Sequence, residues 1–264
     1  MNRRYAIVGI VVLLAAATTG MLAGYSPTDA TASSPATPTG LEGSYTVTET
    51  VLVDGDRFFE RESIVDAETG AQRSVLLFED SSYDSYWTGD GERYTKVAFE
   101  SEARLEEWLA GSEDEVVRTV DDEHGAILAA SDGAADRADG PVGDTFPDRL
   151  SHSQLEMAAF TETDETTVDG TTVETYEPRT GWIDVQLERS SHETVYVADA
   201  DGEVRVGPDG RLRHANVTVE RVDAETWGEY LLERGESYAT TFEYDVAEST
   251  ENVRPEWLDD VPSE

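Results

Sequence analysis

Apolar and polar residues alternate along most of the chain, a pattern that predicts β-strands with one buried face. The clearest run covers residues 45–53, where Tyr and Val at most odd positions alternate mainly with Thr at even positions. Asp54-Gly55 then predicts a tight turn into a second strand over residues 57–65. Further strands are expected at residues 75–78, 83–87, 93–99, 162–168, 171–176, 183–187, 194–198, 203–206, 212–222 and 241–246.

Three short segments have helical rather than alternating patterns. Ser101 is suited to cap a helix over residues 102–110. A second helix is expected over residues 151–160, and residues 227–231 also have helical spacing. Residues 130–144, rich in Asp, Gly and Ala, predict an exposed loop between the first two helices.

Together these elements predict a mainly β (α+β) fold. Roughly ten antiparallel strands with two or three short helices favour a highly curved antiparallel sheet, or an open incomplete barrel, wrapped around helix. We expect this fold to form one domain over residues 43–264.

The chain begins with a segment suited to a membrane. Tyr5–Gly24 contains no charge and is long enough to cross about 30 Å of hydrocarbon as a helix. Arg3 and Arg4 place its start inside, so the remainder lies outside. Residues 1–25 therefore predict either a retained N-terminal anchor or a cleaved signal peptide. Residues 26–42, rich in Ser, Thr and Pro, predict a linker.

The end of this segment has the sequence of a lipoprotein export signal except at one position. Leu22-Ala23-Gly24 is followed by Tyr25, where a lipoprotein has the cysteine that carries lipid. The chain has no cysteine at all, so disulfides and cysteine metal sites are excluded as well. If the protein stays on a membrane, the apolar segment must hold it there.

Charge narrows the range of environments and partners. The chain has 57 acidic and 19 basic residues, a net charge of −38, and a single lysine, Lys96. Such acidity self-repels in dilute salt and keeps a protein soluble where ions are concentrated, which indicates a halophilic protein. Nucleic acid is an unsuitable partner, because no basic stripe is present to displace phosphate counterions.

Motifs for catalysis or metal binding are missing from the sequence. The four histidines lack the spacing of a zinc helix, and neither G-x-S-x-G nor a P-loop occurs. Acidic clusters at residues 113–115 and 121–123 are typical of a solvated acidic face. Residues 199–203 lack the spacing of a calcium loop and predict a turn. We therefore expect no enzyme, no bound metal and no cofactor.

Two kinds of binding position stand out instead. Asn216-Val217-Thr218 is a glycosylation sequon, and the alternation of its strand directs Asn216 outward. Large apolar residues on one face of several strands are candidates to line an apolar pocket. These residues are Tyr45, Val47, Val217, Val219, Phe242 and Tyr244.

Several short stretches, in this order, resemble a known family. They are Tyr45-Thr46-Val47-Thr48, Tyr86-Trp87-Thr88-Gly89-Asp90-Gly91, Tyr94-Thr95-Lys96, Asp209-Gly210-Arg211-Leu212 and Pro255-Glu256-Trp257-Leu258. The arrangement resembles haloarchaeal cell-surface lipoproteins of unknown function that share the architecture of the LolA-like lipoprotein-carrier superfamily. The resemblance implies an open, incomplete β-barrel over helices, with lipid or an acyl chain bound in its concavity. Tyr25 departs from the family, because it replaces the lipid-bearing cysteine.

Two functions remain open at this point. The first is a non-catalytic domain outside the cell membrane, held by one N-terminal helix, that binds a lipid or another apolar ligand in the concave sheet. The second is a structural or protein-interaction domain of the cell envelope with a filled core and no ligand. Cleavage of the N-terminal segment would instead release the domain as a secreted protein.

Overall fold

The computed structural model describes residues 28–37, 43–120, 124–130, 154–168, 171–188, 191–249 and 252–261. The expected apolar helix Tyr5–Gly24 and the expected loop after residue 130 lie outside these residues, as do Ser151 and Ser153. No helix among the described residues is long and apolar enough to cross a membrane.

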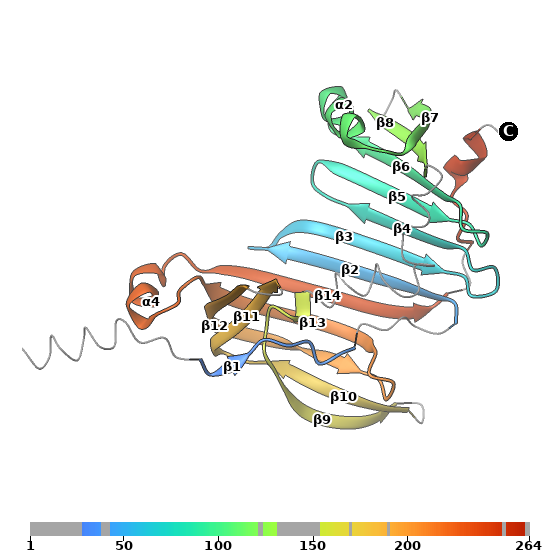
Figure 1. Cartoon of the computed structure of the whole chain (residues 1–264). Coiled ribbons are helices and arrows are strands. Elements are labelled where there is room, and N and C mark those ends of the chain that lie inside the picture. Colours follow the sequence, from blue (N-terminus) through green and yellow to red (C-terminus); the bar gives the residue numbers. More distant parts are fainter. Residues whose placement is uncertain are drawn as a thin grey trace, which may run out of the picture.

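The mainly β fold is confirmed. The described residues form one large curved sheet of 14 strands, in the order β1-β11-β12-β13-β14-β2-β3-β4-β5-β6-β8-β7, with β10 and β9 continuing from β12 (Figure 1). The strands are β1 Ala30–Thr31, β2 Tyr45–Val53, β3 Asp56–Val65, β4 Gln72–Leu77, β5 Ser81–Trp87, β6 Arg93–Phe99, β7 Glu115–Val120, β8 Gly125–Ala129, β9 Phe160–Val168, β10 Thr171–Pro178, β11 Gly181–Glu188, β12 Ser191–Val206, β13 Leu212–Val222 and β14 Tyr238–Glu248.

The Asp54-Gly55 turn forms as predicted, and glycines with positive φ lie in two further hairpin turns. Asp54 and Gly55 both have positive φ, 52° and 85°, the conformation that a two-residue turn between β2 and β3 requires. Gly91, with φ of 92°, lies in the turn between β5 and β6. Gly210, with φ of 76°, closes the turn between β12 and β13. Local turn chemistry therefore sets the pairing of these strands.

Two α-helices and one 3₁₀-helix are described. Helix α2, Glu102–Gly111, begins at Ser101, whose hydroxyl accepts from the backbone N–H of Arg104 at 3.4 Å. Helix α4, Trp227–Glu233, begins with a capping box between Thr226 and Glu229. The 3₁₀-helix covers Glu256–Asp260. The helix expected over residues 151–160 ends early, because Phe160 already begins β9.

Three elements differ from the expected pattern. Strand β8 was not predicted, because nearly all of its residues are buried and it shows no alternation; its partner β7 was also missed. The turn expected at residues 199–203 is wrong. These residues continue β12 into one long strand, with a register shift between Val197 and Asp199 and positive φ at Gly202.

Residues 28–37 belong to the folded domain, whereas the sequence placed them in the linker 26–42. Strand β1 pairs in parallel with β11, and the backbone N–H of Thr37 donates to the carbonyl of Gly210 at 2.8 Å. Ala36 is buried in the main core. Backbone pairing therefore fixes a segment whose composition alone suggests a spacer.

The main core covers one face of the sheet, which we call the inner face and which carries Val47, Val217 and Phe242. The outer face carries a smaller cluster around Ile64 and Tyr86, against which the C-terminal segment packs through Leu258. The inner face near β6 and β8 is covered by α2 through Leu105, Trp108 and Leu109, in a third cluster.

Candidate functional site

The structure brings the six apolar candidates together in the main core. Tyr45, Val47, Val217, Val219, Phe242 and Tyr244 are all buried and belong to one cluster. Leu155, Ala158 and Ala159 are buried in the same cluster, so residues 154–159 cover part of this face. A pocket among the described residues lies farther along the inner face.

Its starting point is a β-bulge in β3. Val51 pairs with Phe59 and Leu52 pairs with Arg57, so Phe58 is an extra residue without a partner in the ladder. A bulge of this kind turns a side chain away from the regular alternation. Phe58 is 58% exposed, yet its ring lies near those of both Phe59 and Phe78, with centroids 6.0 and 6.4 Å apart.

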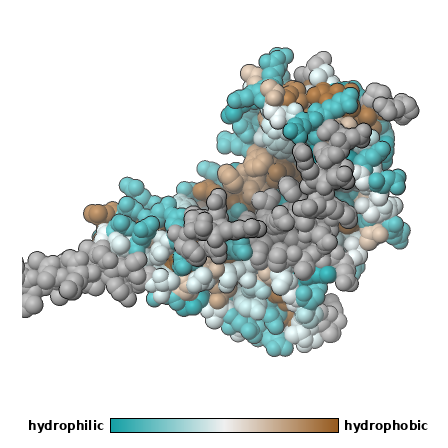
Figure 2. Space-filling view, viewed as in Figure 1, coloured by the Kyte–Doolittle hydropathy of each residue, from teal (hydrophilic) through white to brown (hydrophobic). Residues whose placement is uncertain are grey.

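From this bulge a continuous row of aromatic rings crosses the inner face to α2. We call it the aromatic stripe. Each ring contacts the next at centroid distances of 5.9 to 6.4 Å. Its members are Phe58, Phe59, Phe78, Tyr83, Phe99 and Trp108. Figure 2 shows apolar surface at the bend of the molecule, over the ends of β3, β4 and β5.

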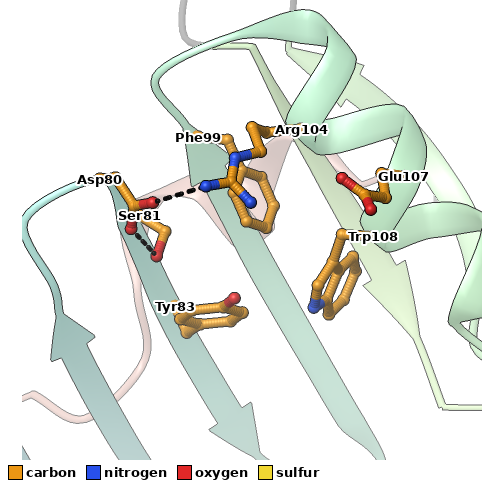
Figure 3. Close-up of a pocket in the computed structure, with 7 residues that line it drawn as sticks. All are labelled: Asp80, Ser81, Tyr83, Phe99, Arg104, Glu107 and Trp108. Atoms are coloured by element: carbon orange, nitrogen blue, oxygen red, sulfur yellow. Dashed lines mark hydrogen bonds and ion pairs between the residues drawn. The ribbon is translucent and has the colours of Figure 1, made fainter.

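The α2 end of the stripe opens into a pocket of about 280 Å³ (Figure 3). Tyr83, Phe99 and Trp108 form its apolar wall, and four polar residues complete the lining: Asp80, Ser81, Arg104 and Glu107. This volume is close to the lower limit of roughly 300 Å³ for small-molecule sites. The pocket therefore suits one end of a slender apolar molecule, with the stripe continuing beyond it.

Polar groups at the mouth of the pocket mostly pair with one another. Arg104 Nη2 lies 3.7 Å from Asp80 Oδ2, and the Ser81 hydroxyl donates to Asp80 Oδ1 at 3.1 Å. Both members of the ion pair are at least half exposed. The mouth carries a slight excess of negative charge, because Glu107 also lines it. A polar head group would remain in water there while apolar atoms contact the rings.

A buried ion pair lies on the same face beside the stripe. Arg61 and Glu49 form it across β2 and β3, and both side chains are almost completely buried. Next to it, hydroxyl pairs continue across the sheet, Ser63 with Ser74 and Ser85 with Thr95, each 3.1 Å apart. The inner face thus carries polar pairs between the main core and the cluster under α2.

A polar cluster on the outer face joins the C-terminal segment to the sheet. Arg73 donates through Nε and Nη2 to Asp84 at 2.9 and 2.7 Å, and the Trp257 indole donates to Asp84 Oδ2 at 2.6 Å. The hydrogen bonds to Asp84 raise the pKa of Arg73. This cluster fixes the C-terminal segment on the sheet.

The remaining predicted positions lie outside the pocket. Asn216 is exposed on β13, as its strand alternation predicts, and faces Glu203 and Glu243 in the ladder. His214 Nδ1 lies 2.7 Å from Asp245 Oδ1 at the surface. Within the described ranges, no group of three His, Cys, Asp or Glu side chains could hold a metal ion.

Sequence reasoning missed the aromatic stripe and the Glu49–Arg61 pair. Phe58 and Phe59 are adjacent, so strict alternation assigns them to opposite faces, and only the bulge brings both near Phe78. Glu49 lies between Val47 and Val51 in the alternation of β2, so its side chain points to the same buried face. A lone acidic residue at an inward position was the available signal.

No protein-family model and no curated protein matches the chain.

Proposed function

We propose that this protein is a non-catalytic, membrane-tethered domain outside the cell that binds an elongated apolar molecule, such as an acyl chain, along the aromatic stripe. The observation that carries the proposal is the unbroken row of rings from exposed Phe58 to the pocket at Trp108. Phe58 is exposed and the rings at positions 78, 83, 99 and 108 are half-buried, and soluble monomers rarely leave a contiguous apolar patch in contact with water without a use. Rings in a row offer contact area along the full length of a slender ligand.

The N-terminal sequence supports the tether. Twenty uncharged residues follow two arginines. Since the chain has no cysteine, a lipid attached to cysteine cannot serve as the anchor instead of this segment. In this proposal the strongly curved sheet is an open, incomplete barrel like that of the lipoprotein-carrier superfamily, preceded by one apolar helix. The ligand lies toward one end of the inner face and not at its centre.

Binding of a fluorescent polyunsaturated fatty acid to the domain from residue 26 onward, in high salt, tests the proposal. We expect saturable binding with energy transfer from tryptophan. Trp108→Ala and Phe58→Ser should each weaken the affinity about tenfold, equivalent to about 1.4 kcal/mol. Leu232→Ser is the matched control, because Leu232 is an exposed apolar residue on α4, away from the stripe.

A second function is favoured by the filled centre of the inner face. The six candidate residues pack with Leu155, Ala158 and Ala159 in one core. A structural or protein-interaction domain of the envelope needs only such a core. Absence of fatty-acid binding by the unaltered domain would favour this second function.

A further inference from the structure

Helix α4 carries two leucines that the other described residues leave exposed. Leu231 is 58% exposed and Leu232 is 86% exposed. The other side of the helix is fixed, because Trp227 and Tyr230 lie 5.4 and 6.3 Å from Trp182, between ring centroids. The helix is thus held by its aromatic residues and presents its leucines outward, where Figure 2 shows an isolated apolar spot at the α4 end.

The chain enters the folded domain at the same place. The backbone N–H of Asp29 donates to the carbonyl of Trp182 at 2.9 Å, and the backbone N–H of Trp182 donates to Asp29 Oδ2 at 3.1 Å. Trp182 therefore contacts both the entry point and α4. Figure 1 shows β1 and α4 at the same end of the molecule.

The distance from this entry point to the expected membrane span is short. Five residue steps separate Gly24, the last residue of the span, from Asp29. At about 3.6 Å per step, the chain reaches at most about 18 Å. A retained anchor therefore keeps α4 close to the membrane surface.

We propose that Leu231 and Leu232 insert into the interfacial layer of the membrane that holds residues 5–24, so that the domain rests on the bilayer through α4. The proposal rests on the retained anchor of the proposed function. Amphipathic helices bury apolar side chains about 5–10 Å into this layer, where Trp and Tyr are also common. Trp227 and Tyr230 supply such residues beside the leucines.

The charges around α4 determine when this contact forms. Glu225, Glu229, Glu233 and Glu236 outnumber Arg234 in this segment, so an anionic surface repels it in dilute salt. At about 1 M salt the Debye length is about 3 Å, and the apolar contact prevails.

The contact also orients the aromatic stripe. Val53 pairs with Thr240, and Asp54 Oδ1 accepts from the N–H of Ala239 at 2.8 Å, so the β2–β3 turn adjoins the start of β14, shortly after α4. Exposed Phe58 follows this turn, so the open end of the stripe lies on the side of the domain that faces the bilayer.

Because the chain has no cysteine, single-cysteine labelling of the full chain tests the insertion directly. Leu232→Cys would carry an environment-sensitive fluorophore in vesicles of phosphatidylcholine with a minor share of phosphatidylglycerol, at about 2 M KCl. We expect a blue shift, a rise in emission of about threefold, and quenching by spin-labelled lipid. Val116→Cys, at an exposed apolar site on β7, is the matched control. Its label should show the emission of a fluorophore in water, without quenching by spin-labelled lipid.

A second variant keeps both leucines in place. Arg234→Cys, one residue after α4, should show the same shift and quenching. Labels at 232 and 234 that are as water-exposed as the label at 116 would overturn the insertion.

Flotation of the same vesicles separates the two claims. Protein that floats while both labels report water means that the anchor is retained and the α4 contact is wrong. Protein that does not float means that the tether itself is wrong, and the α4 proposal falls with it.

Discussion

Glu49 and Arg61 show how one pair of residues affects the stability of the whole sheet. Both side chains are almost completely buried on the inner face and form an ion pair there. Removal of one partner takes this ion pair away from a charge that stays buried, so Glu49→Ala should lower the free energy of unfolding by about 3–5 kcal/mol. Replacement of both by apolar residues, in Glu49→Leu/Arg61→Met, should cost far less. Denaturant titration in high salt measures both; an equal loss in the two variants would contradict this account.

Tyr176 gives a prediction in alkaline solution. Its hydroxyl donates to Glu174 Oε2 at 2.7 Å, and this hydrogen bond, followed by burial and the charges of Glu174 and Glu162, raises the pKa of Tyr176 from 10.0 to about 12. The folded state therefore holds the proton more tightly than the unfolded state. The resulting stabilisation is complete below pH 10 and is lost as the pH rises toward about 12.

The Tyr176→Phe variant tests this dependence. It lacks the hydrogen bond at every pH, so the unaltered protein should be more stable below pH 10, and the difference should shrink toward pH 12. Thermal unfolding at a series of pH values measures it. A difference that stays constant over this range would rule out the coupling between Tyr176 and Glu174.

At the scale of elements, a hydrogen bond adds to the apolar packing that holds the C-terminal segment on the sheet. The Trp257 indole donates to the Asp84 carboxylate at 2.6 Å. Trp257→Phe keeps an aromatic ring but removes this bond to a charged group, so the unfolding free energy should fall by about 1.5–3 kcal/mol. Glu256→Gln, at an exposed neighbouring position, is the control and should change little. Equal stability of the two variants would mean that the bond contributes nothing.

Elements that depend on local patterns could be predicted, and elements that depend on distant partners could not. The β2–β3 hairpin follows from alternation and Asp54-Gly55 alone. Strand β1 forms only because β11 offers an edge, and Phe58 joins the stripe only because of a bulge opposite β2. The six apolar candidates lie in one cluster on the inner face, but sequence periodicity does not reveal what covers that face. The candidate pocket therefore required the structure.

At the scale of the whole molecule, the charge should make folding dependent on salt. With a net charge of −38, carboxylates repel across the surface when the Debye length is about 10 Å, as at 0.1 M salt. Circular dichroism at about 0.1 M and at about 3 M KCl should show a marked loss of strand signal and a lower melting temperature at the lower salt. Equal melting temperatures would mean that the acidity does not serve a halophilic environment.

The central claim is that the aromatic stripe holds an elongated apolar ligand. The most direct measurement is photo-crosslinking of the full chain with a diazirine-bearing fatty acid in high salt, followed by mapping of the modified peptides by mass spectrometry. The account predicts modification of the stripe at Phe58, Tyr83 and Trp108, suppressed by unlabelled fatty acid, in addition to any modification within residues 1–27. Modification confined to residues 1–27 would contradict the account. Modification of the stripe that unlabelled fatty acid does not suppress would contradict it as well.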